Sequence, residues 1–321
     1  MEQKFYEVLL NETTIKDSTR SVYIRHLERL CHEVLPTRVN GSVRVPTLTD
    51  VIEDPGLVER ALRGMGSHAQ DLYVASVIAL LYHTDLRKKR PELYTAWCDL
   101  KRKIRQPIER KYLSNAPDER QEAAWVTFED LLRARAAADL DSRSGTQDAL
   151  LLWMYTSIPP VRGDYYNCKV VHVHTEKDAA LAVAAAKDGG YNAFILGARR
   201  VPSRTVLTDY KTSQTYGCIV TPVPPELAAA VRRSLRAFSR DTLFVDSRGQ
   251  GYSGRNSFTK WANRVLRRSL ENERVSLTTL RHIFISRRDL ALETKTGAER
   301  AEVARAMGHG NATQDRYNFR R

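Results

Sequence analysis

Cysteine is scarce in this sequence, with four residues among 321, at positions 31, 98, 168 and 218. They lie far apart and form no Cys-x-x-Cys pair, which argues against a zinc site and against a small disulfide scaffold. The chain also lacks the basic-then-apolar start of a signal peptide, and its longest apolar run, near residues 74–82, is about half the length of a membrane span. We therefore expect a soluble protein of a reducing compartment, with no metal, no cofactor and no membrane partner.

Acidic residues are too few to balance the basic ones. Lysine and arginine total 51 against 38 aspartates and glutamates, which gives a net charge of +13. The basic residues recur along the whole chain, and a hydrophobic fraction of 42% is ordinary for a folded protein. A positive surplus spread over folded sequence predicts a surface that attracts a polyanion, most often nucleic acid.

The first third of the sequence is typical of helices. Apolar residues recur at helical intervals in 19–34 and 72–86, and Pro91 is placed where a helix start tolerates proline. We expect an all-α domain over residues 1–105, followed by a basic linker over 106–124 that Pro107 interrupts. The linker is either a solvated connector or part of a clamp around DNA, and the residues expected to contact DNA are Lys101, Arg102, Lys103, Arg105, Arg110 and Lys111.

Helices and short strands alternate in the remainder, residues 125–321. Thr127 is the expected N-cap of a helix over 128–138, and a second apolar helix covers 147–157. Strand patterns follow at 169–174, 193–196, 205–207 and 218–220, and further helices at 227–238 and 257–270. The predicted class is α+β and mainly helical, with a small antiparallel sheet in this second domain.

The C-terminal segment carries the most specific pattern. Leu277-Thr-Thr-Leu-Arg-His282 opens an apolar helical stretch, and Met307-Gly-His309 comes eight residues before Tyr317. Cutting a DNA phosphodiester without metal requires a nucleophile, cations that balance charge on the non-bridging oxygens, and an acid for the leaving oxygen. Arginine suits the phosphate because its planar fork binds two oxygens, and a tyrosine hydroxyl can hold the phosphoryl group covalently.

Two upstream segments complete the set. Arg162 lies in Ile158-Pro-Pro-Val-Arg162-Gly-Asp-Tyr, after a helix break, and Lys211 lies in Asp209-Tyr-Lys211-Thr-Ser-Gln-Thr-Tyr-Gly217. A single arginine or lysine in a basic protein is usually a surface charge. The order, the local context and the spacing of these residues are what make them candidates for one site.

Together these motifs resemble the tyrosine recombinase and integrase family, and the resemblance covers about half the chain. It implies that Tyr317 attacks DNA, that Arg162 and Arg281 clamp the phosphate, that His309 donates a hydrogen bond to it, and that Lys211, on a β-hairpin, protonates the leaving 5′-oxygen. The helical first domain fits the family's core-binding domain by class only. The forms Pro-Pro-x-Arg and Tyr-Lys-Thr look more like recombinases of large DNA viruses and eukaryotic mobile elements than bacterial chromosome-resolving ones.

The sequence departs from the family pattern in three places. Thr278 stands where the family usually has histidine or lysine, and threonine is a poor base. His282, next to Arg281, is an alternative candidate for the base, although packing beneath the site is its favoured role. The span from Arg162 to Lys211 is long, which indicates an excursion over residues 175–200 and a rival lysine, Lys187, without a hairpin pattern. Only four residues follow Tyr317, so either the chain is trimmed or its copies assemble through other surfaces.

Three functions stay open at this point. The leading one is a site-specific DNA recombinase or integrase that acts as a homotetramer on two DNA duplexes through a 3′-phosphotyrosine, with no small-molecule substrate. A type IB topoisomerase or telomere resolvase shares the catalytic logic. A DNA-binding protein without catalysis is the third, supported by Thr278 alone. A protein with any of these functions works where its target DNA lies, which is a bacterial or viral-host cytoplasm or a eukaryotic nucleus. The sequence identifies neither the compartment nor the target DNA.

Overall fold

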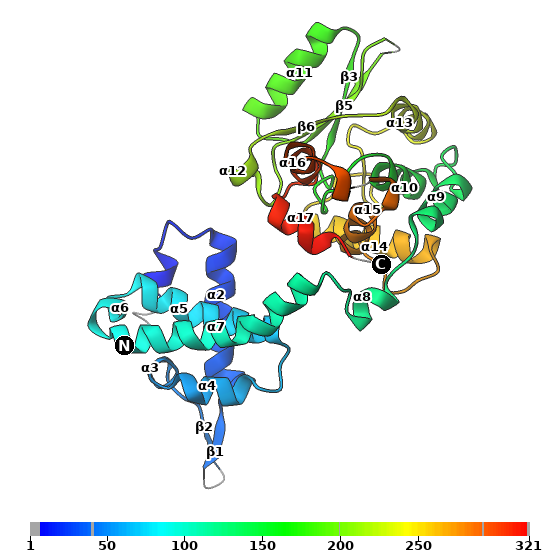
Figure 1. Cartoon of the computed structure of the whole chain (residues 1–321). Coiled ribbons are helices and arrows are strands. Elements are labelled where there is room, and N and C mark those ends of the chain that lie inside the picture. The colour runs from blue at the N-terminus through cyan, green and yellow to red at the C-terminus, as the bar shows by residue number, and fades with distance from the viewer. Residues whose placement is uncertain (1–6, 40–41, 199, 291, 320–321) are drawn as a thin grey trace. The chain divides into compact units, whose positions relative to one another are not determined.

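The structure, a computed structural model, describes residues 7–39, 42–198, 200–290 and 292–319. The chain divides into two compact units, residues 1–114 and residues 115–321 (Figure 1). Among the described residues, no helix combines the length and the apolar character of a membrane span.

The first unit is built almost entirely of helices. A two-stranded antiparallel hairpin is added to the all-α arrangement that the sequence predicts, with β1 and β2 paired from Thr37↔Arg44 to Val39↔Ser42. Its elements are α2 (Asp17–Arg29), the π-helical turn η1 (Leu30–Val34), β1 (Thr37–Val39), β2 (Ser42–Arg44), α3 (Leu48–Glu53), α4 (Pro55–Leu62), α5 (Ser67–His83), α6 (Leu86–Lys89) and α7 (Pro91–Ser114).

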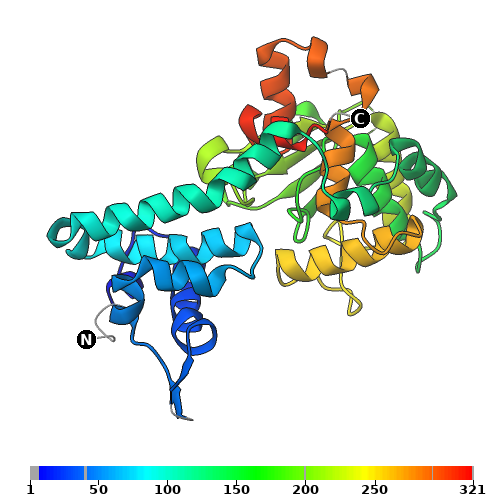
Figure 2. The same ribbon diagram turned by 60° about the horizontal axis from the view of Figure 1, so that its bottom comes forward.

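Trp97 of α7 lies at the centre of the core of this unit. Its side chain is fully buried, and its indole N–H donates to the carbonyl of Ile52 at 2.9 Å, so its one polar atom is satisfied. Helices α5 and α7 lie side by side in both views (Figures 1 and 2). Their contact buries Leu93, Leu100 and Ile104, which together with Trp97 follow one face of α7 at intervals of three to four residues.

The segment predicted as a linker, residues 106–124, is largely helical. Helix α7 continues through Pro107 to Ser114, although an internal proline removes one helical hydrogen bond. Buried Ile104 and Ile108 on either side of the proline hold the helix against the unit. It ends where Asn115 adopts a left-handed conformation, φ 48°, and α8 (Glu119–Ala123) follows within the second unit.

The second unit combines helices with a four-stranded sheet, and the predicted α+β class is confirmed. Thr127 caps α9 as expected, in a reciprocal capping box with Asp130. Its other elements are α9 (Phe128–Ala137), α10 (Thr146–Ser157), β3 (Lys169–Val173), α11 (Glu176–Asp188), β4 (Ala193–Gly197), β5 (Arg204–Leu207), α12 (Ser213–Tyr216), β6 (Ile219–Pro222), α13 (Pro225–Ala237), α14 (Arg255–Ser269), α15 (Leu277–Ile285), the 3-10 turns η2 (Arg288–Leu290) and η3 (Leu292–Thr294), α16 (Gly297–Ala306) and α17 (Asn311–Tyr317).

The sheet is mixed, whereas the sequence analysis expected an antiparallel one. The strand order is β3-β4-β5-β6, with β3 and β4 parallel and the other two pairs antiparallel. The reason is α11: the predicted excursion over 175–200 is a crossover helix, which returns the chain to the same end of the sheet. Lys187, the rival lysine, lies in this helix.

Strand β4 shows how the sheet joins two layers. All five of its residues are buried. Ala193 and Ile195 face α11 in a small cluster, while Phe194 and Leu196 belong to the main core with α10, α13 and α14. The alternation follows the two-residue period of a strand. In Figure 1, α11 covers one side of the sheet, and the helices that carry the predicted site lie on the other.

We expect Trp97→Ala to lower the free energy of unfolding by about 3–5 kcal/mol, because it leaves a large cavity and an unpaired buried carbonyl. Urea denaturation measures the loss. Leu113→Ala is the control in the same helix, since Leu113 is 83% exposed and should change stability by less than about 0.5 kcal/mol. Equal effects of the two substitutions would show that Trp97 does not support the first unit.

Candidate active site

Arg281, in the middle of α15, is the centre around which the site is built. Its side chain is fully buried. One guanidinium nitrogen, Nη1, donates to the carbonyls of Pro160 at 3.1 Å and Met307 at 3.0 Å, and Nη2 donates to Nδ1 of His309 at 2.7 Å. The guanidinium thereby joins three segments that are far apart in the sequence. No carboxylate of the described residues lies within ion-pair distance of it.

The protonation of His309 follows from this contact. Arginine has no lone pair to offer, so Nδ1 of His309 accepts and the ring proton of the neutral imidazole is on Nε2. Burial above all, and then the charges of Arg281 and Arg162, lower the pKa of His309 to about 3, so the ring is neutral at physiological pH. Gly308 makes the turn possible with φ 69°, and a Cβ there would also press on the Tyr210 ring at 3.3 Å.

Two donors at this site have no partner. Nε of Arg281 and Nε2 of His309 are both buried, and neither has a hydrogen-bond partner among the described residues. Burial lowers the pKa of the Arg281 guanidinium, and attraction to the Tyr317 side chain partly opposes that shift. A buried cation with unused N–H groups, and no carboxylate beside it, is unfavourable unless an anion completes it. The arrangement is suited to an oxyanion.

Tyr317, the last residue of α17, lies directly against this group. Its ring stacks on His309 with centroids 5.4 Å apart and an interplanar angle of 18°, and the Arg281 Cζ lies 5.0 Å from the ring centre. Helices α15 and α17 are side by side in Figure 1, which explains how residues so distant in sequence meet. The side chain is half-buried, so it remains accessible.

His282 packs beneath Tyr317. Its ring lies between those of Tyr317, at 4.4 Å, and Phe319, at 4.3 Å, and its Nδ1 donates to the Tyr317 carbonyl at 3.1 Å. Ser286 adds contacts to the same carbonyl and to the Phe319 N–H. Burial, as the largest cause, lowers the pKa of His282 to about 4. These contacts fit the packing role that the sequence analysis favoured.

Arg162 lies in the turn after α10. The Tyr155 hydroxyl donates to its backbone carbonyl at 2.6 Å, and its side chain is half-buried. Its charge contributes to lowering the pKa values of both Arg281 and His309, and the bond from Arg281 to the Pro160 carbonyl keeps its turn next to them. Like Arg281, it makes no ion pair with a carboxylate among the residues that the structure describes.

Lys211 lies on the connection between β5 and β6, which pair as an antiparallel hairpin with Leu207 opposite Ile219. The lysine is exposed and lies beside the buried cluster rather than in it. Its neighbour Thr212 donates through its hydroxyl to the Gly308 carbonyl at 2.6 Å, which ties the hairpin loop to the turn that carries His309.

Thr278, like Lys211, is a predicted site residue that lies outside the buried cluster. It is exposed in the first turn of α15, one turn before Arg281. Gln314, one turn before Tyr317, was not predicted from the sequence. Its amide is buried, and neither its nitrogen nor its oxygen is hydrogen-bonded to a described residue.

Asn192 and Arg255 also escaped prediction, although both contact the segments around Arg162 and Lys211. Asn192 follows Gly189-Gly190-Tyr191, so the sequence indicates a turn residue. Arg255 follows Gly254 at the start of a helix, where a basic residue is typical of the surface. Neither has a local sequence signal, because their partners are distant in the chain.

The six basic residues expected to contact DNA lie along the exposed sides of α7. Five are exposed and Lys101 is half-exposed. Arg102 pairs with Asp99, Lys103 with Glu59 and Arg105 with Glu109. Such exposed pairs contribute roughly 0–1 kcal/mol each, so a phosphate can replace the carboxylate at little cost.

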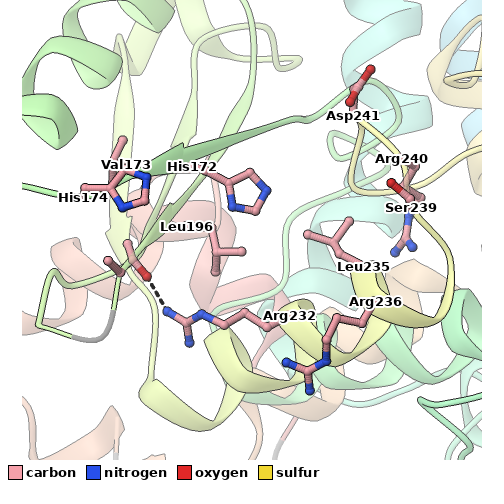
Figure 3. A pocket seen from close by; sticks show the side chains of 12 residues that line it. His172, Val173, His174, Leu196, Arg232, Leu235, Arg236, Ser239, Arg240 and Asp241 are labelled. Carbon is pink, nitrogen blue, oxygen red and sulfur yellow. Dashed lines mark hydrogen bonds between the residues drawn. The ribbon is translucent and has the colours of Figure 1, made fainter.

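A separate hollow of about 450 Å³ opens at the carboxyl ends of β3 and β4 (Figure 3). His172 and His174 lie on one side of it and Arg232 and Arg236 on the other, with Arg232 bonded to the Gly197 carbonyl. None of the predicted site residues lines this hollow.

Comparison with known proteins adds little. No protein-family model matches the chain, and no curated protein matches it. Among solved structures, the crystal structure of XerA recombinase is similar with a TM-score of 0.40 and 13% identity over 99% of this chain and 93% of that one. At this similarity nothing known of XerA recombinase is carried over to the present chain.

The two buried histidines predict a pH dependence of stability. Their pKa values in the folded state lie below the ordinary value of about 6.5, so the unfolded state binds more protons and the free energy of unfolding falls as pH drops from about 6.5 to 4.

His282→Phe keeps a ring between Tyr317 and Phe319 and removes one titrating group. We expect its loss of stability between pH 7 and pH 5 to be smaller than that of the wild type by roughly 1–2 kcal/mol. Urea unfolding at both pH values tests this, and an unchanged loss would mean that His282 is not buried as a neutral ring.

Proposed function

We propose that this protein is a site-specific DNA recombinase or integrase that cleaves and rejoins strands through a 3′-phosphotyrosine on Tyr317. One observation carries the proposal: an accessible tyrosine ring lies against a buried arginine and a neutral histidine, each with an unused N–H donor. Such a site offers a nucleophile and an anion cradle together, as phosphoryl transfer requires.

The cleavage step divides among the chain's own residues. The Tyr317 oxygen attacks phosphorus and its hydroxyl proton passes to water, while the bond from phosphorus to the 5′-oxygen breaks. Arg281 and Arg162 balance the charge that grows on the non-bridging oxygens, and Nε2–H of His309 donates to one of them. The neutral state of His309 suits this role, because its Nδ1 is occupied by Arg281 and its proton is therefore fixed on Nε2.

Lys211 protonates the leaving 5′-oxygen in this scheme. Its position supports the assignment, since the tie from Thr212 to Gly308 keeps the hairpin loop next to the turn that carries His309. Thr278 is assigned at most a hydrogen bond to a phosphate oxygen, because a threonine hydroxyl is a poor proton acceptor. Attack by a 5′-hydroxyl of a second strand on the phosphotyrosine reverses the chemistry and joins the strands.

DNA binding is proposed for both units. The net charge of +13 and the exposed basic side of α7 support it. Exchange between two duplexes requires four tyrosines, so the active species is a homotetramer on two DNA sites. We assign no metal or cofactor to the step, in which side chains supply the nucleophile, the phosphate clamp and the acid, and water takes the Tyr317 proton.

Tyr317→Phe should abolish formation of a covalent protein–DNA adduct while leaving DNA affinity unchanged, because only the attacking oxygen is removed. The substrate is a nicked suicide duplex whose sequence is selected from a random library by binding to this protein. The adduct is seen as a slower band on a denaturing gel, and it should form equally in the presence of EDTA.

Tyr191→Phe is the matched control, since Tyr191 lies in the same unit outside the cluster and should leave adduct formation at the wild-type level. An adduct that persists in Tyr317→Phe, or none with the wild type, would overturn the proposal. Exchange between two selected sites supports a recombinase, whereas relaxation of supercoiled plasmid of any sequence would replace it with a topoisomerase.

The basic side of α7 makes a second test possible. Each lysine or arginine that neutralises a phosphate makes the negative slope of log K against log salt concentration steeper by about 0.9. Replacing Arg102, Lys103, Arg105 and Arg110 by glutamine should therefore make the slope shallower by about 3–4. Fluorescence anisotropy with labelled duplex at several salt concentrations gives both slopes. An unchanged slope would remove α7 from the DNA interface.

A further inference from the structure

One buried side chain links the segments that carry Arg162 and Lys211. Asn192 precedes β4 directly and is fully buried. Its Nδ2 donates to the carbonyls of Asp164 and Asp209, both at 2.8 Å, and its Oδ1 accepts from the N–H groups of Thr208 at 2.8 Å and Asp209 at 2.9 Å. Asp164 lies two residues after Arg162, and Asp209 two residues before Lys211.

These four bonds use the whole hydrogen-bonding capacity of the amide. A primary amide has two N–H donors and an oxygen with two lone pairs, and here every one is engaged with backbone. Aspartate has the same shape but no donor, and serine is too short to span both segments. A residue that does nothing but pack would not require this complete match.

Arg255, at the start of α14, makes a second link between the same two segments. Its Nε lies 2.7 Å from Oδ1 of Asp164, and its Nη2 lies 3.6 Å from Oδ1 of Asp209. The Tyr166 hydroxyl donates to the other oxygen of Asp209 at 2.8 Å. Asp164 is buried, and its burial raises the pKa of its carboxyl while the charge of Arg255 opposes the shift. Side chains and backbone of the two segments are therefore joined twice.

The two segments differ in what else holds them. The Arg162 turn is also fixed by the Tyr155 hydroxyl, by the bond from Arg281 to Pro160, and by its packing on α14, where a Cβ on Gly163 would lie only 2.5 Å from the Thr259 hydroxyl. Lys211 itself is exposed, whereas Arg162 is half-buried.

Besides Asn192 and Arg255, the Lys211 loop is held to the rest of the unit by the bonds from Tyr166 to Asp209 and from Thr212 to Gly308 and by burial of the Tyr210 ring in the main core. The bond from the Tyr210 hydroxyl to the Gly217 carbonyl closes the loop on itself. Loss of the double link should therefore displace Lys211 much more than Arg162.

We propose that Asn192 and Arg255 are positioning residues that hold Lys211 at the leaving-oxygen side of the phosphate, at a fixed separation from Arg162. This inference rests on the proposed function. In the step concerned, a Lys211 N–H proton passes to the 5′-oxygen as the bond from phosphorus to that oxygen breaks and the bond from the Tyr317 oxygen to phosphorus forms. A displaced lysine slows only this proton transfer.

Replacing the leaving 5′-oxygen by sulfur makes the step independent of the lysine, because a thiolate leaves without a proton. We therefore compare single-turnover cleavage of the selected suicide duplex with its 5′-bridging-sulfur counterpart. Arg255→Gln and Asn192→Asp should cleave the oxygen substrate about 10–100-fold more slowly than the wild type, as a small misplacement of a catalytic group does. Both should cleave the sulfur substrate within about 3-fold of the wild type.

Lys211→Ala removes the acid itself, so it should be slow on the oxygen substrate and close to the wild type on the sulfur substrate. Arg162→Ala should be slow on both substrates because it removes a charge that balances the phosphate oxygens. Arg204→Gln is the matched control. Arg204 begins β5 and pairs with Glu176 at 2.9 Å, and its side chain is 26% exposed, close to the 33% of Arg255. It has no bond to the Lys211 loop. It should match the wild type on both substrates. Arg255→Lys, which retains one ion pair of the two, should be intermediate on the oxygen substrate.

The inference would be overturned if Arg255→Gln reduced the cleavage rate of the two substrates equally, or if it did not reduce the cleavage rate of the oxygen substrate. Arg255 is partly exposed, so its variants remain informative if Asn192→Asp fails to fold. If the wild type forms no adduct with either substrate, the proposed function itself fails. That result differs from one in which the wild type cleaves both substrates but the variants cleave the sulfur substrate slowly.

Discussion

The site of the second unit depends on the buried guanidinium of Arg281, which forms no ion pair with a carboxylate of the described residues. Arg281 is held by two backbone carbonyls and one histidine, and these contacts bring the Pro160 turn, the end of α16 and the His309 turn to one place. A buried charge is costly unless hydrogen bonds satisfy it, so each of these three segments must stay where it is. The unused donors that remain, with Tyr317 against them, leave a place that a phosphate oxygen fits.

Around this centre, burial decreases from the core to the surface. Arg281 and His309 are locked by burial, Arg162 by a turn with several anchors, and Lys211 by ties made through its neighbours. The mixed sheet explains the arrangement, since the crossover through α11 places Asn192 at the edge where the Arg162 turn and the β5–β6 loop approach each other. An insertion that looked incidental in sequence thus supports the geometry between two catalytic candidates.

The sequence predicted the parts of the site that carry local signals. The turn after the helix break, the hairpin lysine, the Met-Gly-His turn and the terminal tyrosine each have a recognisable context, and the structure brings Arg162, Arg281, His309 and Tyr317 together. Helix starts at Pro91 and Thr127 were predictable from proline placement and capping. Pro107 was misleading, because burial of the isoleucines beside it outweighs its local preference. Asn192 and Arg255 could not be predicted, since their roles depend on partners 16 to 91 residues away.

The central claim is that the site forms a covalent bond between DNA and Tyr317. The most direct measurement is mass spectrometry of the protease-digested adduct trapped on suicide DNA. We predict a nucleotide attached through its 3′-phosphate to the tyrosine oxygen of the peptide that contains Tyr317, with every other tyrosine peptide unmodified. A nucleotide on a different residue, or attached through its 5′-phosphate, would contradict the claim.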